Sequence, residues 1–231
     1  MEILTIDIET IPHQSLPEEC MPVFDPSEVK TGNAGPEKVQ EKINKKRAEF
    51  DKTNNKRMSL DPTLCHVCTF AGVIYDTVKD EIKDKKSFQV KDNLDEEYEC
   101  VHAAWNFIRQ CRSKKTPLVT FNGIGFDIPV LIFRAMALDV PIPETKYFMK
   151  KYESKDHYDL MQVLARWDKS KWKSFDFYLK LFGFEGKPDD FNGSKVYGAW
   201  QAGEYDKIQR YCEGDALQLA ELFQRVEAWV I

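Results

Sequence analysis

Apolar and polar residues alternate over residues 2–9, at the start of the chain. Successive side chains of a strand point to opposite faces, so Ile6 and Ile8 share one face while Asp7 and Glu9 share the other. We therefore expect a first strand with one apolar and one partly acidic face. Runs of β-branched and apolar residues predict further strands at 64–76, 87–90 and 117–121.

Helical periodicity dominates much of the remaining chain. Val101, Ala104, Trp105 and Ile108 are three or four residues apart or adjacent, which places them on one helix face. Strands come first, helices and strands then alternate, and helices follow, an order that favours an α/β fold with a mixed sheet and helices on its faces. The predicted helices cover 36–57, 93–111, 126–138 and most of the chain from Tyr158 onward.

The polar segment 13–60 separates the first two predicted strands. Its helix starts at Pro36, a favoured first position, and carries eight Lys or Arg against four Asp or Glu up to Arg57. Such a run is usually a solvated helix face. The alternative is that it holds a polyanion, and its candidate residues for that role are Lys42, Lys45, Lys46 and Arg47. We expect residues 1–231 to form a single domain, with 13–60 as a basic, partly helical insertion.

Composition narrows the functional classes. The chain has 231 residues, 42% of them hydrophobic, and a net charge of −5 from 38 acidic and 33 basic side chains. This balance does not attract nucleic acid as a whole, so such a partner needs a local basic patch or a metal. A mean hydropathy of −0.50, without a long apolar run or a secretory leader, favours a cytoplasmic protein without a membrane span. The C-x-x-C pair Cys65 and Cys68 lacks a second pair, and we interpret it as core packing.

Asp7 and Glu9 are the first candidate site. Two carboxylates on one strand face repel each other, by about 1 kcal/mol in water and about 4 kcal/mol at an effective dielectric constant near 20. Solvent or a nearby Lys or Arg is the simpler compensation for that repulsion, and from this stretch alone it is favoured. A divalent cation is the alternative.

Two later motifs add acidic residues. The stretch 121–127 ends a strand, turns through glycines and reaches Asp127, which either caps the next helix or points a third carboxylate at the sheet edge. Tyr211 and Asp215 are four residues apart and share a face of the last helix. Asp215 there is either paired, with Tyr211 or Arg210, or bound to metal.

In this order, Asp-x-Glu, Asn-x-x-x-Phe-Asp and Tyr-x-x-x-Asp resemble the DEDD exonucleases of the ribonuclease-H-like fold, in the subtype with tyrosine. The chain is similar to the freestanding 3′–5′ exonucleases related to the proofreading domain of family-B DNA polymerases. The histidine subtype has His at or near position 210, where this chain has Arg. The resemblance covers residues 1–11 and roughly 64–228, and it includes the runs 158–161, 182–187 and 193–196.

The resemblance implies hydrolysis of phosphodiester bonds from the free 3′ end of single-stranded DNA, with release of nucleoside 5′-monophosphates. Two Mg²⁺ or Mn²⁺ ions are implied as cofactors, since both prefer hard oxygen ligands. Possible partners include replication or repair proteins. The implied metal ligands are Asp7, Glu9, Asp127 and Asp215. Tyr211 is implied to orient the attacking water, with Asp159 behind the ligands and Asn122 and Phe126 beside the nucleic acid.

Three alternatives stay open. The same fold can carry a 3′–5′ exoribonuclease, because metal chemistry at a phosphodiester does not distinguish the sugars. The chain can instead be a nucleic-acid-binding accessory subunit of a replication or repair complex that does not cleave. A third alternative is an unrelated α/β domain whose carboxylates are caps and ion pairs, but the ordered motifs disfavour it.

Overall fold

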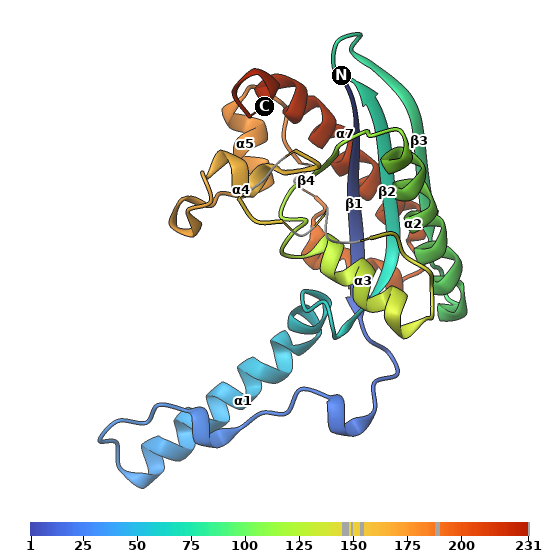
Figure 1. Ribbon diagram of the computed structural model, residues 1–231. Coiled ribbons are helices and arrows are strands. Elements are labelled where there is room, and N and C mark those ends of the chain that lie inside the picture. The colour runs from blue at the N-terminus through green and yellow to red at the C-terminus, as the bar shows by residue number, and fades with distance from the viewer. Residues whose placement is uncertain (145–147, 149, 153–154, 188–189, 231) are drawn as a thin grey trace.

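The computed structural model describes residues 1–144, 148, 150–152, 155–187 and 190–230. A five-stranded mixed sheet in the order β3-β2-β1-β4-β5 is its centre (Figure 1). β4 and β5 run parallel to β1, so the carboxyl ends of these three strands lie at the same edge of the sheet. The strands are β1 (Glu2–Pro12), β2 (Cys65–Asp76), β3 (Glu81–Gln89), β4 (Leu118–Thr120) and β5 (His157–Asp159).

Helices cover both faces of this sheet, as the sequence predicts. On one face, α2 (Glu97–Ser113) and α3 (Asp127–Ala137) enclose the larger apolar cluster. The other face is covered by α4 (Leu160–Leu164), α5 (Phe175–Leu181) and α7 (Tyr205–Val230). The short helix α6 (Val196–Gln201) packs at the carboxyl end of β1 in a third, smaller cluster. The molecule is therefore a three-layer α/β fold.

The alternation of β1 decides which way its acidic residues face. Leu4, Ile6 and Ile8 are buried in the cluster beneath α2 and α3. Thr5 lies on the opposite face, where its hydroxyl donates to the carbonyl of Ala216 on α7 at 2.6 Å. Side chains two residues apart share a face, so the odd-numbered positions of β1 that follow Thr5 are directed toward α7.

A β-bulge interrupts the pairing of β1 and β2 beside these residues. Glu9 pairs with Thr69 and Thr10 pairs with Val67, so Cys68 is the extra residue of β2. Cys65 and Cys68 are both buried free thiols, in different apolar clusters, which confirms the prediction of core packing. Bulges bend a strand and re-aim its side chains, and they are common next to active sites.

The insertion leaves and returns at the end of β1. Figure 1 shows it as an arm that extends from the sheet, built around the 24-residue helix α1 (Pro36–Ser59). At 1.5 Å per residue, α1 is about 36 Å long. Two bonds fix its base: the Thr10 hydroxyl donates to the Ser59 carbonyl at 2.6 Å, and the His13 amide donates to the Leu64 carbonyl at 2.9 Å. Two single-turn helices, Glu18–Cys20 and Pro26–Glu28, precede α1.

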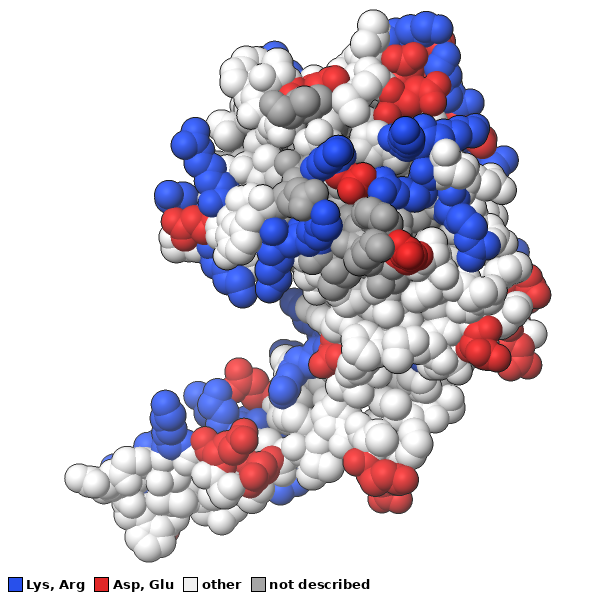
Figure 2. Space-filling view, viewed as in Figure 1, with Lys and Arg blue, Asp and Glu red and all other residues white. Residues whose placement is uncertain are grey.

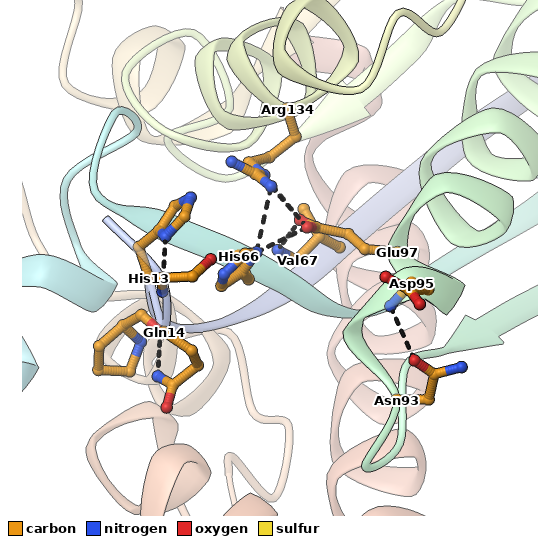
Figure 3. A network of polar contacts seen from close by, with 10 residues as sticks. His13, Gln14, His66, Val67, Asn93, Asp95, Glu97 and Arg134 are labelled. Atoms are coloured by element: carbon orange, nitrogen blue, oxygen red, sulfur yellow. Dashed lines mark hydrogen bonds and ion pairs between the residues drawn. The ribbon is translucent and has the colours of Figure 1, made fainter. Parts of the chain in front are cut away.

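A buried polar network joins β2, α2 and α3 near this base (Figure 3). Arg134 donates to both carboxylate oxygens of Glu97, at 2.8 and 2.7 Å. Glu97 also contacts Nδ1 of His66 at 2.6 Å and accepts from the Val67 amide at 2.8 Å. The charges are thus paired where they are buried, which keeps their desolvation cost tolerable.

The structure corrects two strand predictions. β3 begins at Glu81 rather than near Ser87, because Lys83, Lys85 and Lys86 belong to the strand and not to a loop. β3 is at the edge of the sheet, where charged side chains face solvent and discourage pairing with other chains. β5, only three residues long, falls within the region expected to be mostly helical.

The other predicted helix boundaries agree with the structure within a few residues. Residues 188–189, in the region expected to be mostly helical, lie outside the described residues. Three-residue single turns at Leu94–Glu96, Lys169–Lys171 and Gly193–Lys195 complete the elements. Among the described residues, none of the helices is long and apolar enough to span a membrane.

Candidate active site

Three carboxylates meet between the sheet and α7. Asp7 and Glu9 come from β1 and Asp215 from α7, and one oxygen of each lies within 4.8 Å of the other two. α7 is held against β1 here by the Thr5 bond and by the Cys212 thiol, which donates to the Asp7 carbonyl at 3.3 Å. Strand alternation and helix docking together produce this cluster.

Asp127 lies beside the cluster, at the first position of α3. The residue at the N-cap is Phe126, without a side-chain cap bond, so the expectation that Asp127 could be an ordinary cap is wrong. Asp127 is 6% exposed, and the backbone N–H of Ile8, between the two acidic residues of β1, is close enough to its carboxyl group to lower the pKa that burial raises. Its carboxyl group therefore faces β1, as the alternative interpretation of the 121–127 loop predicts.

Asp159 holds the loop that delivers Asp127. Its carboxylate accepts from the amides of Asn122 at 2.9 Å and Ile124 at 3.0 Å, and it also caps α4 through Gln162 at 3.4 Å. The turn is tight: a Cβ on Gly123 would come within 2.2 Å of the Thr120 hydroxyl. Asp159 thus supports the site from behind without joining the carboxylate cluster.

The sequence analysis did not identify Lys187 as part of this site. Its ammonium donates to a carboxylate oxygen of Asp215 and to the Tyr211 hydroxyl, the latter at 3.0 Å. Gly186, at φ +82°, turns the chain so that the Lys187 amide donates to Asp176 at 3.0 Å. Lys187 is the last residue of the run 182–187, one of the runs that resemble the exonuclease family. Its place in that run is the signal in the sequence that could have identified it.

Tyr211 and Asp215 share the inner face of α7, as their spacing predicts. Burial raises the pKa of Asp215, while the nearby Lys187 ammonium and, after it, Tyr211 lower it in part. The ion-pair partner of Asp215 is Lys187, not Arg210, which is exposed. Burial, followed by the charge of Asp215, raises the pKa of Tyr211, so its hydroxyl keeps its proton at neutral pH.

The carboxyl groups of the site repel one another strongly. Burial, followed by the negative charge of Asp215, raises the pKa of Glu9 to about 8. Burial raises the pKa of Asp127 to about 7, and burial with the charges of Asp215 and Glu9 raises the pKa of Asp7. Lys187 supplies one positive charge against four acidic groups. Burial lowers its own pKa, but the charges of Asp215 and Asp7 outweigh this and raise it.

These residues fit a divalent cation. Oδ2 of Asp7 is buried and has no hydrogen-bond partner among the described residues, so a strong acceptor faces the cluster unused. Asp215 already pairs with one cation, the Lys187 ammonium. Hard carboxylate oxygens are the ligands that Mg²⁺ and Mn²⁺ prefer. Asp7, Glu9 and Asp215 are the residues that would hold such an ion.

The residues expected to contact nucleic acid fall into separate places. Phe126 lines a pocket of about 350 Å³ that also includes Glu9. Asn122 is at the loop turn, with a left-handed φ of 68°. The four basic residues named from the sequence lie at a different cavity, of about 1160 Å³, between α1 and residues 23–30: Lys42, Lys45 and Lys46 line it, and Arg47 lies over the Phe24 ring that lines it as well.

The protein is an α/β fold with a mixed sheet between helices and an acidic cluster on the carboxyl-terminal half of its first strand. The sequence model of the predicted 3′–5′ exonucleases related to the exonuclease domain of PolB matches residues 60–229. The chain belongs to this family. Comparison with the curated proteins finds no match.

Solved structures share the fold at low sequence identity. The family B DNA polymerase from the hyperthermophilic archaeon Pyrobaculum calidifontis matches with a TM-score of 0.61 and 18% identity, over 98% of this chain and 24% of the polymerase. The nuclease domain of 3′hExo, a DEDDh family member bound to rAMP, matches with a TM-score of 0.51 and 10% identity, over 98% of this chain and 92% of that domain. The chain thus spans about a quarter of the polymerase that it matches, and the fold class predicted from the sequence is confirmed.

Proposed function

We propose that the protein is a metal-dependent 3′–5′ exonuclease that shortens single-stranded DNA from its 3′ end and releases nucleoside 5′-monophosphates. The observation that carries the proposal is the acidic cluster of Asp7, Glu9 and Asp215, with Asp127 beside it, in a chain of an exonuclease family. We propose further that residues 1–231 act as one exonuclease domain.

Asp7, Glu9 and Asp215 would hold one Mg²⁺ or Mn²⁺ ion, and Asp7 and Asp127 would face a second. Bound ions supply Lewis-acid chemistry: they polarise the phosphate and stabilise the attacking and leaving oxygens of an in-line displacement. The protein contributes the fixed positions of these carboxylates on β1, α3 and α7. Phosphate also carries negative charge, so without cations this site would repel it.

Tyr211 and Lys187 provide the proton-bearing groups of the site. Lys187 donates to the Tyr211 oxygen, at 3.0 Å, which leaves the hydroxyl proton free to point at another acceptor. A neutral tyrosine hydroxyl in this position can orient the attacking water. These groups support our assignment of the chain to the tyrosine subtype of DEDD exonucleases.

An exoribonuclease is the second candidate. The nuclease domain of 3′hExo has the same fold and was solved with rAMP. Recognition of RNA depends on contacts to the 2′-OH, which the acidic cluster itself does not provide. A preference for RNA would therefore come from residues around the cluster rather than from the metal ligands.

Incubation with single-stranded DNA and RNA, labelled at the 5′ end, tests the proposal. We expect a ladder of products shortened stepwise from the 3′ end in millimolar Mg²⁺ or Mn²⁺, and none in EDTA. Asp7→Ala and Asp215→Asn should each remove almost all turnover, because each removes a proposed metal ligand. Full activity in EDTA, or a near wild-type rate in a folded Asp7→Ala protein, would refute the metal mechanism. A protein that binds DNA tightly without cleaving it would instead support the accessory subunit.

A further inference from the structure

We propose that the carboxyl-terminal end of α1 completes a nucleotide subsite next to Glu9, in which Lys52 and Lys56 bind a backbone phosphate other than the one being cleaved. This inference rests on the proposed exonuclease function and adds to it how the substrate strand is held. It concerns α1, which lies outside the stretch 60–229 that matches the exonuclease family.

The subsite is a pocket of about 350 Å³ between the end of β1 and the ends of two helices. Ile8, Glu9 and Thr10 of β1 line it, so the pocket lies directly beside the acidic cluster. The volume is at the small end of the range for ligand pockets, which suits one nucleotide and not a duplex. Any strand whose end enters this pocket places its phosphates near the cluster.

The charged side of the pocket comes from α1. Lys52 and Lys56 are one helical turn apart, and both are exposed and line the pocket. Neither forms an ion pair with a carboxylate among the described residues, unlike Lys46, which pairs with Glu49 at 2.7 Å. Unpaired ammonium groups beside a pocket can bind a phosphate. Such binding depends on charge and does not depend on which base the nucleotide carries.

Two aromatic side chains of the pocket offer a surface for a base. Phe126, from the start of α3, and Tyr197, from α6, are both half-buried and line the same pocket. Aromatic rings stack on bases with little preference for sequence, as single-strand binding proteins show. Ser194 and Gln201 add hydrogen-bonding groups. The pocket therefore combines the cationic, aromatic and polar groups that can bind the phosphate, base and sugar of a nucleotide.

The anchoring of α1 keeps these lysines in place. The Thr10 hydroxyl bonds the Ser59 carbonyl at 2.6 Å, and Met58 is buried at 2% exposure. Lys52 and Lys56 are thus within two turns of a point fixed to β1, whereas Lys38 and Lys45 lie further out along the arm. In Figure 2, Lys and Arg side chains occur on both sides of the recess between this arm and the rest of the molecule.

Two short substrates separate the subsite from the catalytic centre. A thymidine dinucleotide with free hydroxyl ends carries only the phosphate to be cleaved, while the trinucleotide carries one more. We would measure kcat and KM for both with Mn²⁺, and equilibrium binding of the trinucleotide by calorimetry with Ca²⁺. The variants are Lys52→Ala with Lys56→Ala, and the matched control Lys79→Ala with Lys86→Ala, which removes the same charge from exposed positions of the β2–β3 hairpin. Alanine is a strong helix former, so the Lys52/Lys56 variant should keep α1.

We expect the Lys52/Lys56 variant to raise KM and Kd for the trinucleotide at least tenfold, with kcat and all dinucleotide parameters within twofold of wild type. The control should match wild type on both substrates. Trinucleotide binding that is unchanged in the variant, undetectable in the wild type, or weakened equally for the dinucleotide would overturn the subsite. If the wild type binds the trinucleotide through these lysines but cleaves neither substrate, the proposed function fails and the subsite stands.

Discussion

At the scale of single residues, the site is a set of acidic groups that the fold holds close together despite their electrostatic repulsion. Glu9 and Asp127, with pKa values of about 8 and about 7, retain protons near neutral pH when no metal neutralises them. A hard divalent cation removes this cost, since metal binding displaces the protons from the carboxyl groups. We therefore expect no turnover until a cation is bound.

Tyr211→Phe separates metal binding from water positioning. We expect the turnover number to fall by about 10²–10³-fold, as for the loss of one positioned hydrogen bond in a transition state. Stabilisation of the protein by Mn²⁺ should remain, because Tyr211 is not among the three clustered ligands. The measurement pairs single-turnover cleavage with the Mn²⁺-induced change in melting temperature. Wild-type turnover in Tyr211→Phe would exclude a role for the hydroxyl.

At the scale of elements, α1 lies outside the stretch 60–229 that matches the exonuclease family. The cavity along its outer half is lined by Lys42, Lys45 and Lys46 together with the aromatic side chains of Phe24 and Phe50. These residues are far along the arm from the acidic cluster, so only a long strand can reach them and the cluster at the same time. A solvated helix or a docking surface for a protein partner is the competing interpretation.

Replacement of Lys42, Lys45, Lys46 and Arg47 together by Ala tests the outer half of α1. We expect weaker binding of long single strands and a flatter dependence on salt, by a slope of about 0.7 for each phosphate that the helix no longer neutralises. Dinucleotide cleavage should stay unchanged. Binding is measured by fluorescence anisotropy over a range of NaCl concentrations.

A control with the same loss of charge carries alanine at Lys79, Lys83, Lys85 and Lys86, at the β2–β3 hairpin, which Figure 1 shows at the opposite end of the molecule from α1. Its binding and salt slope should match wild type. If the α1 variant also matches wild type, the outer half of the helix does not bind the strand.

At the scale of the whole molecule, His157 links the strands that carry the loop to the site. Its Nε2 contacts the Thr120 hydroxyl at 2.7 Å and its Nδ1 contacts the Phe148 carbonyl at 2.7 Å, both in the buried interior. Burial lowers the pKa of His157 to about 4. The neutral ring is therefore part of the native packing of β4 and β5.

This histidine makes stability depend on pH. Because its pKa is lower in the folded than in the unfolded protein, its contribution is present above about pH 6.5 and is lost as the pH falls toward 4, by at most about 3 kcal/mol. We expect His157→Gln to be less stable at pH 7.5 and to lose less free energy of unfolding between pH 6.5 and 4.5 than wild type. Urea unfolding at several pH values measures both. Parallel pH profiles for the two proteins would contradict the assignment.

The sequence by itself determined the strand face that carries Asp7 and Glu9, because alternation along a strand is a local property of the backbone. It also determined that Tyr211 and Asp215 share a helix face, since four residues make about one turn. The order of the motifs identified the family, and the apolar periodicity identified a mixed sheet with helices on its faces.

Only the tertiary structure decided which groups meet. Lys187 is 28 residues from Asp215 along the chain, and no local pattern predicts that its ammonium pairs with that carboxylate. Whether Asp127 caps a helix or faces β1 depends on the loop that Asp159 holds from β5, a strand too short to show periodicity. Likewise, which lysines of α1 approach Glu9 follows from the anchor at Thr10 and not from their charge. Contacts between distant segments depend on how the helices pack on the sheet, and no single stretch of the sequence determines that packing.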